Sequence, residues 1–203
     1  MVILTLLAIG YLFGAARQSP LWRALLSSMP AVLASAIAYL TFHAVSALWM
    51  PAATGWGLGG ISLPAGASLL LGLLFGARGA VGVALASCCI AWQGAQAPGL
   101  IDALVSGALS GAAPCLALRL GVKTLALSPT LQGLTARKFL WLALAFALIS
   151  TVLQQAWRVA CGQTADVLQR AVAMAVGDWV GSVLVMYAAG LLLHGAARRL
   201  TGR

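Results

Sequence analysis

Long uninterrupted apolar runs are the feature that most limits how this chain can fold. Runs of about 20 residues recur along the sequence, and each is long enough to cross a bilayer core of about 30 Å as a helix. In hydrocarbon every backbone N–H and C=O must find a partner within the chain, so such runs predict helices. The sequence therefore predicts an all-α, polytopic integral membrane bundle with a single transmembrane domain over residues 1–203.

The apolar runs divide into about seven transmembrane helices, within a range of six to eight. The expected spans are residues 1–16, 24–49, 61–77, 80–92, 99–120, 139–160 and 167–194. Residues 50–60 are rich in glycine and carry no charge. That composition fits a loop and a re-entrant segment equally well, so both alternatives stay open.

The basic residues fall mainly on one side of this seven-span arrangement. With the N-terminus outside, only Arg158 and Arg170 of the 12 basic residues lie on the outer side. Cytoplasmic loops of membrane proteins are enriched in Lys and Arg, so this bias predicts a cytoplasmic C-terminus. It also accounts for the formal net charge of +9, which therefore does not indicate a nucleic-acid partner. The inner-side residues are Arg17, Arg23, Arg78, Arg119, Lys123, Arg137, Lys138, Arg198, Arg199 and Arg203.

Residues that carry out catalysis are scarce in this chain. It has no glutamate, only two histidines (His43 and His194), and none of the short hydrolase, metalloprotease or nucleotide-binding motifs. The 4 cysteines form no C-x-x-C pair, and no histidine lies near them at metal-ligand spacing. We expect no catalytic residue, no metal and no cofactor, and interpret the chain as a non-enzyme.

Asp178 is the acidic residue that the sequence places deepest in the membrane. It lies about ten residues inside the last span, which corresponds to about 15 Å. An ionisable group at that depth is costly and by default faces the bundle interior or a wet cavity. It either binds a cationic or hydroxylated ligand or relays protons, or it is satisfied structurally by an arginine, hydroxyls or a broken helix. Candidate partners are His43, Arg158 and Arg170.

Pairs of glycines four residues apart predict close approach between helices. In a membrane such spacing lets backbones touch and replaces the missing hydrophobic drive for association. We expect packing inside one bundle, with dimerisation as the alternative. The pairs are Gly10/Gly14, Gly72/Gly76, Gly107/Gly111 and Gly177/Gly181.

Two stretches resemble a known family. Residues 63–67 (LPAGA) and 73–78 (LLFGAR) with Gly82 resemble the proline-glycine helix and phenylalanine-glycine turn of the MASE1 membrane-associated sensor domain. Residues 176–182 (VGDWVGS) are similar to the Gly-Asp-x-x-Gly signature in a late helix of that domain. The MASE1-like part covers about residues 49–193. The resemblance implies that the two stretches lie close together in the bundle.

The resemblance also implies a multi-pass sensory module of the bacterial inner membrane. In the family this module usually precedes a cytoplasmic cyclase, phosphodiesterase or kinase, whereas here only nine residues follow His194. We therefore expect a stand-alone module that acts through another membrane or cytoplasmic signalling protein. Alternatives are a substrate-capturing subunit of a small-molecule transporter and a structural subunit of a membrane complex. The residues predicted to contact a small-molecule ligand are Asp178, Trp179, Pro64, Gly66 and His43.

Overall fold

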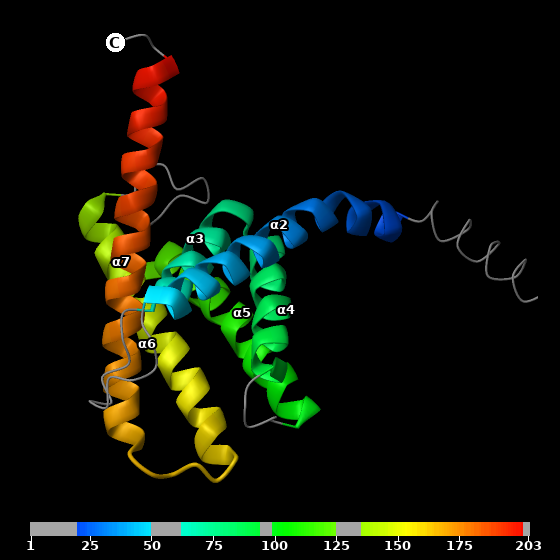
Figure 1. Cartoon of the computed structure of the whole chain (residues 1–203), viewed down its shortest axis with the longest axis vertical. Coiled ribbons are helices and arrows are strands. Elements are labelled where there is room, and N and C mark those ends of the chain that lie inside the picture. The colour runs from blue at the N-terminus through cyan, green and yellow to red at the C-terminus, as the bar shows by residue number, and fades with distance from the viewer. Residues whose placement is uncertain (1–19, 50–61, 94–98, 125–134, 201–203) are drawn as a thin grey trace, which may run out of the picture.

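The described part of the chain is entirely helical, which confirms the predicted all-α class. The computed structural model describes residues 20–49, 62–93, 99–124 and 135–200 (Figure 1). The predicted first span, the pair Gly10/Gly14 and the question of a loop or re-entrant segment at 50–60 lie outside these residues. The helices are α2 (Pro20–Trp49), α3 (Leu63–Phe75), α4 (Ala77–Gln93), α5 (Leu100–Thr124), α6 (Ala136–Ala160) and α7 (Val167–Leu200).

Four of these helices are long and apolar enough to cross a membrane. The candidate spans are Ser27–Leu48 within α2, Leu100–Thr124, Ala136–Ala160 and Val167–Leu191. They correspond to four of the predicted spans, and they identify the chain as a membrane protein. Helix α3 has 13 residues and α4 has 17. At 1.5 Å per residue these two helices extend about 20 and 26 Å, short of a 30 Å core. The total of seven spans therefore stays a prediction.

Helices α4, α5, α6 and α7 pack as antiparallel neighbours, and α2 runs obliquely across them in the view of Figure 1. Gly107 and Gly111 of α5 lie against Ala84 and Ala80 of α4, at distances where a Cβ atom would collide with backbone. Gly82 of α4 gives α2 the same close approach. The glycine spacing thus does in this bundle what the sequence predicted: it brings neighbouring helices into backbone contact.

Helix α3 begins in the interior of the bundle, beside the middle of α7. The backbone N–H of Ser62 donates to the carbonyl of Gly177 (3.1 Å), ten residues or about 15 Å into α7. One turn further on, Gly66 faces Gly181 and Val185, so the two helices run in the same direction. A side chain at Gly181 would collide with the backbone of Ser62.

The resemblance implied that residues 63–67 and 73–78 lie close to residues 176–182. The structure confirms this for the first of these two segments only. The stretch around Gly66 does pack against the Gly177–Gly181 stretch. The stretch 75–78 does not, because it forms the turn at the opposite end of α3.

Gly76 has a different role from the helix contact predicted for it. It ends α3 with a φ of 58°, a left-handed conformation that favours glycine, and its N–H donates to the carbonyl of Gly72. A Cβ atom there would meet no atom of the described residues within 4 Å. Gly72 itself is buried against Pro114 of α5. Gly76 therefore serves the turn, and Gly72 serves the packing.

The apolar core joins α3, α5 and α6, and its members are Ala65, Leu69, Ala113, Ala117, Leu142, Ala143 and Phe146. Many large apolar side chains lie on the outside instead, as expected for helices that face lipid.

A glycine substitution on α7 tests the contact with α3. We expect Gly181→Ala to destabilise the chain by roughly 1–3 kcal/mol, because the added methyl group collides with the backbone of Ser62. Equilibrium unfolding of the purified chain in detergent measures the change. Gly190→Ala on the same helix is the matched control, because its Cβ atom meets nothing within 4 Å in the described part of the chain. Equal stability of the two variants would contradict the close approach.

Candidate functional site

A polar cavity opens between helices α2 to α7, with α4 lining one of its two parts. It consists of two adjoining parts of about 540 and 710 Å³. Both volumes are in the usual range of small-molecule pockets. The two parts share the lining residues Tyr39, His43, Ser110, Gln154 and Arg158. We treat them as one space and call it the polar cavity.

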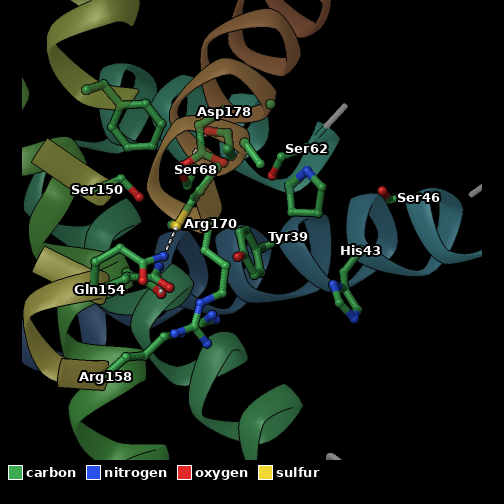
Figure 2. Close-up of a pocket in the computed structure, with 18 of the residues that line it drawn as sticks. Tyr39, His43, Ser46, Ser62, Ser68, Ser150, Gln154, Arg158, Arg170 and Asp178 are labelled. Atoms are coloured by element: carbon green, nitrogen blue, oxygen red, sulfur yellow. Dashed lines mark hydrogen bonds between the residues drawn. The ribbon is translucent and has the colours of Figure 1, made fainter. Parts of the chain in front are cut away.

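Asp178 forms the deep end of the polar cavity. It is only 5% exposed, and the hydroxyl groups of Ser62 and Ser150 lie beside its carboxyl group (Figure 2). Ser68 of α3 lines the same end. None of the described residues forms an ion pair with Asp178. The acid is therefore surrounded by hydroxyl groups, which can donate hydrogen bonds to a carboxylate.

The start of α3 contributes to the electrostatics of this end. Ser62 is the N-cap residue of α3, and its side chain makes no hydrogen bond to its own helix. A helix N-terminus carries partial positive charge on its free N–H groups and favours a nearby carboxylate. Because α3 begins beside Gly177, this terminus lies next to Asp178. The position explains how an acidic group is tolerated so far inside the bundle.

Two arginines lie at the opposite end of the polar cavity, near the α6–α7 turn. Arg158 comes from the last turn of α6 and Arg170 from the first turn of α7. Figure 2 shows their guanidinium groups pointing toward one another. Nη2 of Arg170 donates to the carbonyls of Gln163 (3.1 Å) and Ala165, which fixes its direction. Its Nε is buried and has no partner among the described residues.

Polar side chains of α5 and α6 connect the two ends. Nε2 of Gln154 donates to the hydroxyl group of Ser110 (3.4 Å). Nε1 of Trp157 donates to a carboxylate oxygen of Asp102 (2.5 Å). Gln155 is 5% exposed, and its Oε1 has no partner among the described residues. An unsatisfied buried carbonyl oxygen is costly, and it offers an acceptor to whatever enters the cavity.

The predicted ligand residues divide between the cavity and its surroundings. Asp178, Pro64 and His43 line it. Gly66 is occupied by its contact with α7. Trp179 points away: it is 37% exposed, and its Nε1 donates to the carbonyl of Leu140 (3.4 Å). One residue along a helix turns a side chain by about 100°, which carries Trp179 out of the cavity.

Ser150 and Gln154 line the cavity but were not predicted from the sequence, whereas Arg158 was expected only as a partner of Asp178. One signal for all three was present. Ser150, Gln154 and Arg158 are spaced four residues apart and therefore lie on one face of α6. A polar row of this kind inside an apolar span indicates a cavity or a polar helix contact. Asp102 also differs from a freely solvated helix start, because it binds Trp157 and lines the cavity.

Comparisons with protein-family models, with curated proteins and with solved structures gave no match to this chain. The resemblance to the MASE1 domain therefore stays a prediction. Among the described residues, no group of three or more His, Cys, Asp or Glu side chains lies where it could hold a metal ion.

The accessibility of the polar cavity to water can be measured with single cysteines. In a chain whose Cys88, Cys89, Cys115 and Cys161 are replaced by alanine, we expect Ser150→Cys to react with a neutral, water-soluble methanethiosulfonate reagent. Ser182→Cys is the matched control. Both serines are buried (5% exposed for Ser150 and 0% for Ser182) and lie near Asp178, but Ser182 lines neither part of the cavity. Equal reaction rates at the two positions would show that the cavity is not open to water.

Proposed function

We propose that this chain is a membrane-embedded module that binds a small molecule in the polar cavity and acts through a partner protein. One observation carries the proposal: a buried acid, two arginines, two glutamines and several hydroxyl groups converge on one space inside an otherwise apolar bundle. Polar groups inside a membrane are costly and by default mark a functional site. The size of the cavity and its mixture of donors and acceptors fit a small polar ligand.

We further propose seven spans, an outer N-terminus and a cytoplasmic C-terminus, in the bacterial inner membrane. Support for this orientation comes from the basic residues at the helix ends opposite to Arg158 and Arg170. Enrichment of Lys and Arg marks the cytoplasmic side. The polar cavity then opens toward the outer side, where the α6–α7 turn lies. The supporting residues are Arg78, Arg119, Lys123, Arg137 and Lys138.

The sensory role within this proposal rests on the sequence resemblance to the MASE1 domain. Such a module needs an output, and a cytoplasmic C-terminus would place α7 where a signalling partner can be reached. Co-purification of a cytoplasmic kinase or cyclase with the chain would support this role.

A substrate-capturing subunit of a small-molecule transporter is the second candidate. The observation in its favour is α3, whose N-terminus lies inside the bundle beside the proposed binding site. Transporters use helices that begin at the bilayer midplane to hold their substrates. Accumulation of a bound compound in vesicles would favour the transporter, and binding without accumulation would favour the sensor.

Ligand-dependent stabilisation tests whether the polar cavity is a binding site. We expect at least one compound from a panel of amino acids, dicarboxylates and sugar phosphates to raise the Tm of the purified chain. A ligand at a hundred times its Kd stabilises a protein by about 2.7 kcal/mol, which raises Tm by several degrees in a chain of this size. Asp178→Asn should reduce the shift, because the amide removes the negative charge at the deep end of the cavity.

Trp179→Phe is the matched control for this experiment. It changes the next residue of α7, but its side chain lies outside the cavity against Leu140. The Tm shift should be the same as in the unmodified chain. An equal shift in Asp178→Asn and in the unmodified chain would place binding elsewhere and contradict the proposed site.

A further inference from the structure

The two arginines of the polar cavity have no acidic partner. All 3 acidic residues of the chain lie in its described part, and neither Arg158 nor Arg170 forms an ion pair there. Asp102 is bound to Trp157, and Asp178 lies eight residues beyond Arg170 on α7, a rise of about 12 Å. Two like charges that face each other in a cavity repel unless an anion lies between them.

The surroundings of Arg170 show that this side chain is held in place. Its Nη2 donates to two backbone carbonyls of the α6–α7 turn, so the guanidinium group does not need to fold onto a surface acid. The buried Nε without a partner remains available as a donor. The guanidinium group of Arg158 makes no hydrogen bond among the described residues, and Arg158 lines both parts of the cavity. Guanidinium groups bind carboxylate and phosphate oxygens through paired N–H donors.

We infer that Arg158 and Arg170 bind the carboxylate or phosphate group of an organic anion in the polar cavity. This inference rests on the proposed function, and it specifies the chemical class of the ligand. The rest of the anion extends toward Ser110 and Gln154, which lie between the arginines and the deep end. A soluble metabolite and the head group of an anionic lipid share this chemistry.

The sign of the electrostatic potential in the cavity tests the inference without a known ligand. The probes are three methanethiosulfonate reagents of similar size: sulfonatoethyl (anionic), trimethylammoniumethyl (cationic) and hydroxyethyl (neutral). Each reacts with Ser110→Cys in the chain that has no other cysteine, in nanodiscs of phosphatidylcholine. Ser110 lines both parts of the cavity. Rates are normalised to those of a free thiol in solution.

We expect the anionic reagent to react at least about tenfold faster than the cationic one, since clefts lined by one sign of charge concentrate counter-ions. Arg158→Gln/Arg170→Gln should bring the ratio close to one, and Arg158→Lys/Arg170→Lys should retain the preference. Arg119→Gln/Arg137→Gln is the control with the same loss of charge, and neither residue lines the cavity. If the double Gln variant does not fold, Arg158→Gln alone should lower the ratio. We expect this single variant to fold, because the guanidinium group of Arg158 makes no hydrogen bond among the described residues and its backbone carbonyl, which accepts from the N–H of Gln163, is unchanged.

If the cationic reagent reacts as fast as the anionic reagent, or faster, in the chain that keeps both arginines, the inference is overturned. The neutral reagent shows whether such a result contradicts only the inference about the ligand or the proposed function as well. If it does not reach Ser110→Cys, the cavity is closed to water and the proposed function fails. If it reacts while the anionic preference is missing, only the inference about the ligand fails.

Protection experiments then distinguish the two sources of the anion. Inorganic phosphate in the buffer should slow the neutral reagent at Ser110→Cys if the natural ligand is soluble. Phosphatidylglycerol added to the nanodiscs should slow it if the ligand is a lipid head group. Either result supports the inference, and both effects should be lost in Arg158→Gln/Arg170→Gln. If neither phosphate nor phosphatidylglycerol slows the reaction, the inference of an anion site is overturned.

Discussion

The close approach of α3 to α7 is the contact on which the candidate site depends. Helix backbones touch there because Gly66 and Gly181 have no side chains to separate them. The contact fixes the N-terminus of α3 beside Gly177, about 15 Å from the start of α7. In hydrocarbon a free helix terminus must be satisfied by protein or by water in a cavity. The hydrogen bond from Ser62 to Gly177 and the polar cavity beside it meet this requirement.

The same contact explains how one buried acid can be retained. Gly177 accepts the hydrogen bond from Ser62 at the start of α3, and Asp178 is the next residue of α7. The carboxyl group of Asp178 therefore lies at the N-terminus of α3. Hydroxyl groups and a helix terminus favour the charged form, and burial disfavours it. Such an arrangement is compatible with a structural role and with ligand binding. The arginines, Gln154 and the unsatisfied carbonyl oxygen of Gln155 are what favour binding, because a purely structural acid would not need them.

The polarity of the cavity is divided along its length. Acceptors and hydroxyl groups surround Asp178 at one end, and two guanidinium groups lie at the other. An elongated ligand with an anionic group and a hydrogen-bond donor would satisfy both ends. The apolar core formed by α3, α5 and α6 adjoins the cavity, because its members Ala65 and Phe146 also line it.

The sequence alone determined the helical membrane class, the approximate bounds of α2, α5, α6 and α7, and the position of Asp178 well inside α7. Each depends on local properties: the length of an apolar run, its helical period and the position of one charge within it. The sequence also indicated that the stretches around Gly66 and Gly181 approach each other. Only the tertiary structure decided that α3 begins inside the bundle and that Trp179 faces outward. It also decided that Arg158 and Arg170 share a cavity with Asp178. These depend on how helices distant in sequence are rotated and positioned against each other, and the hydrophobic pattern of any one helix does not contain that information.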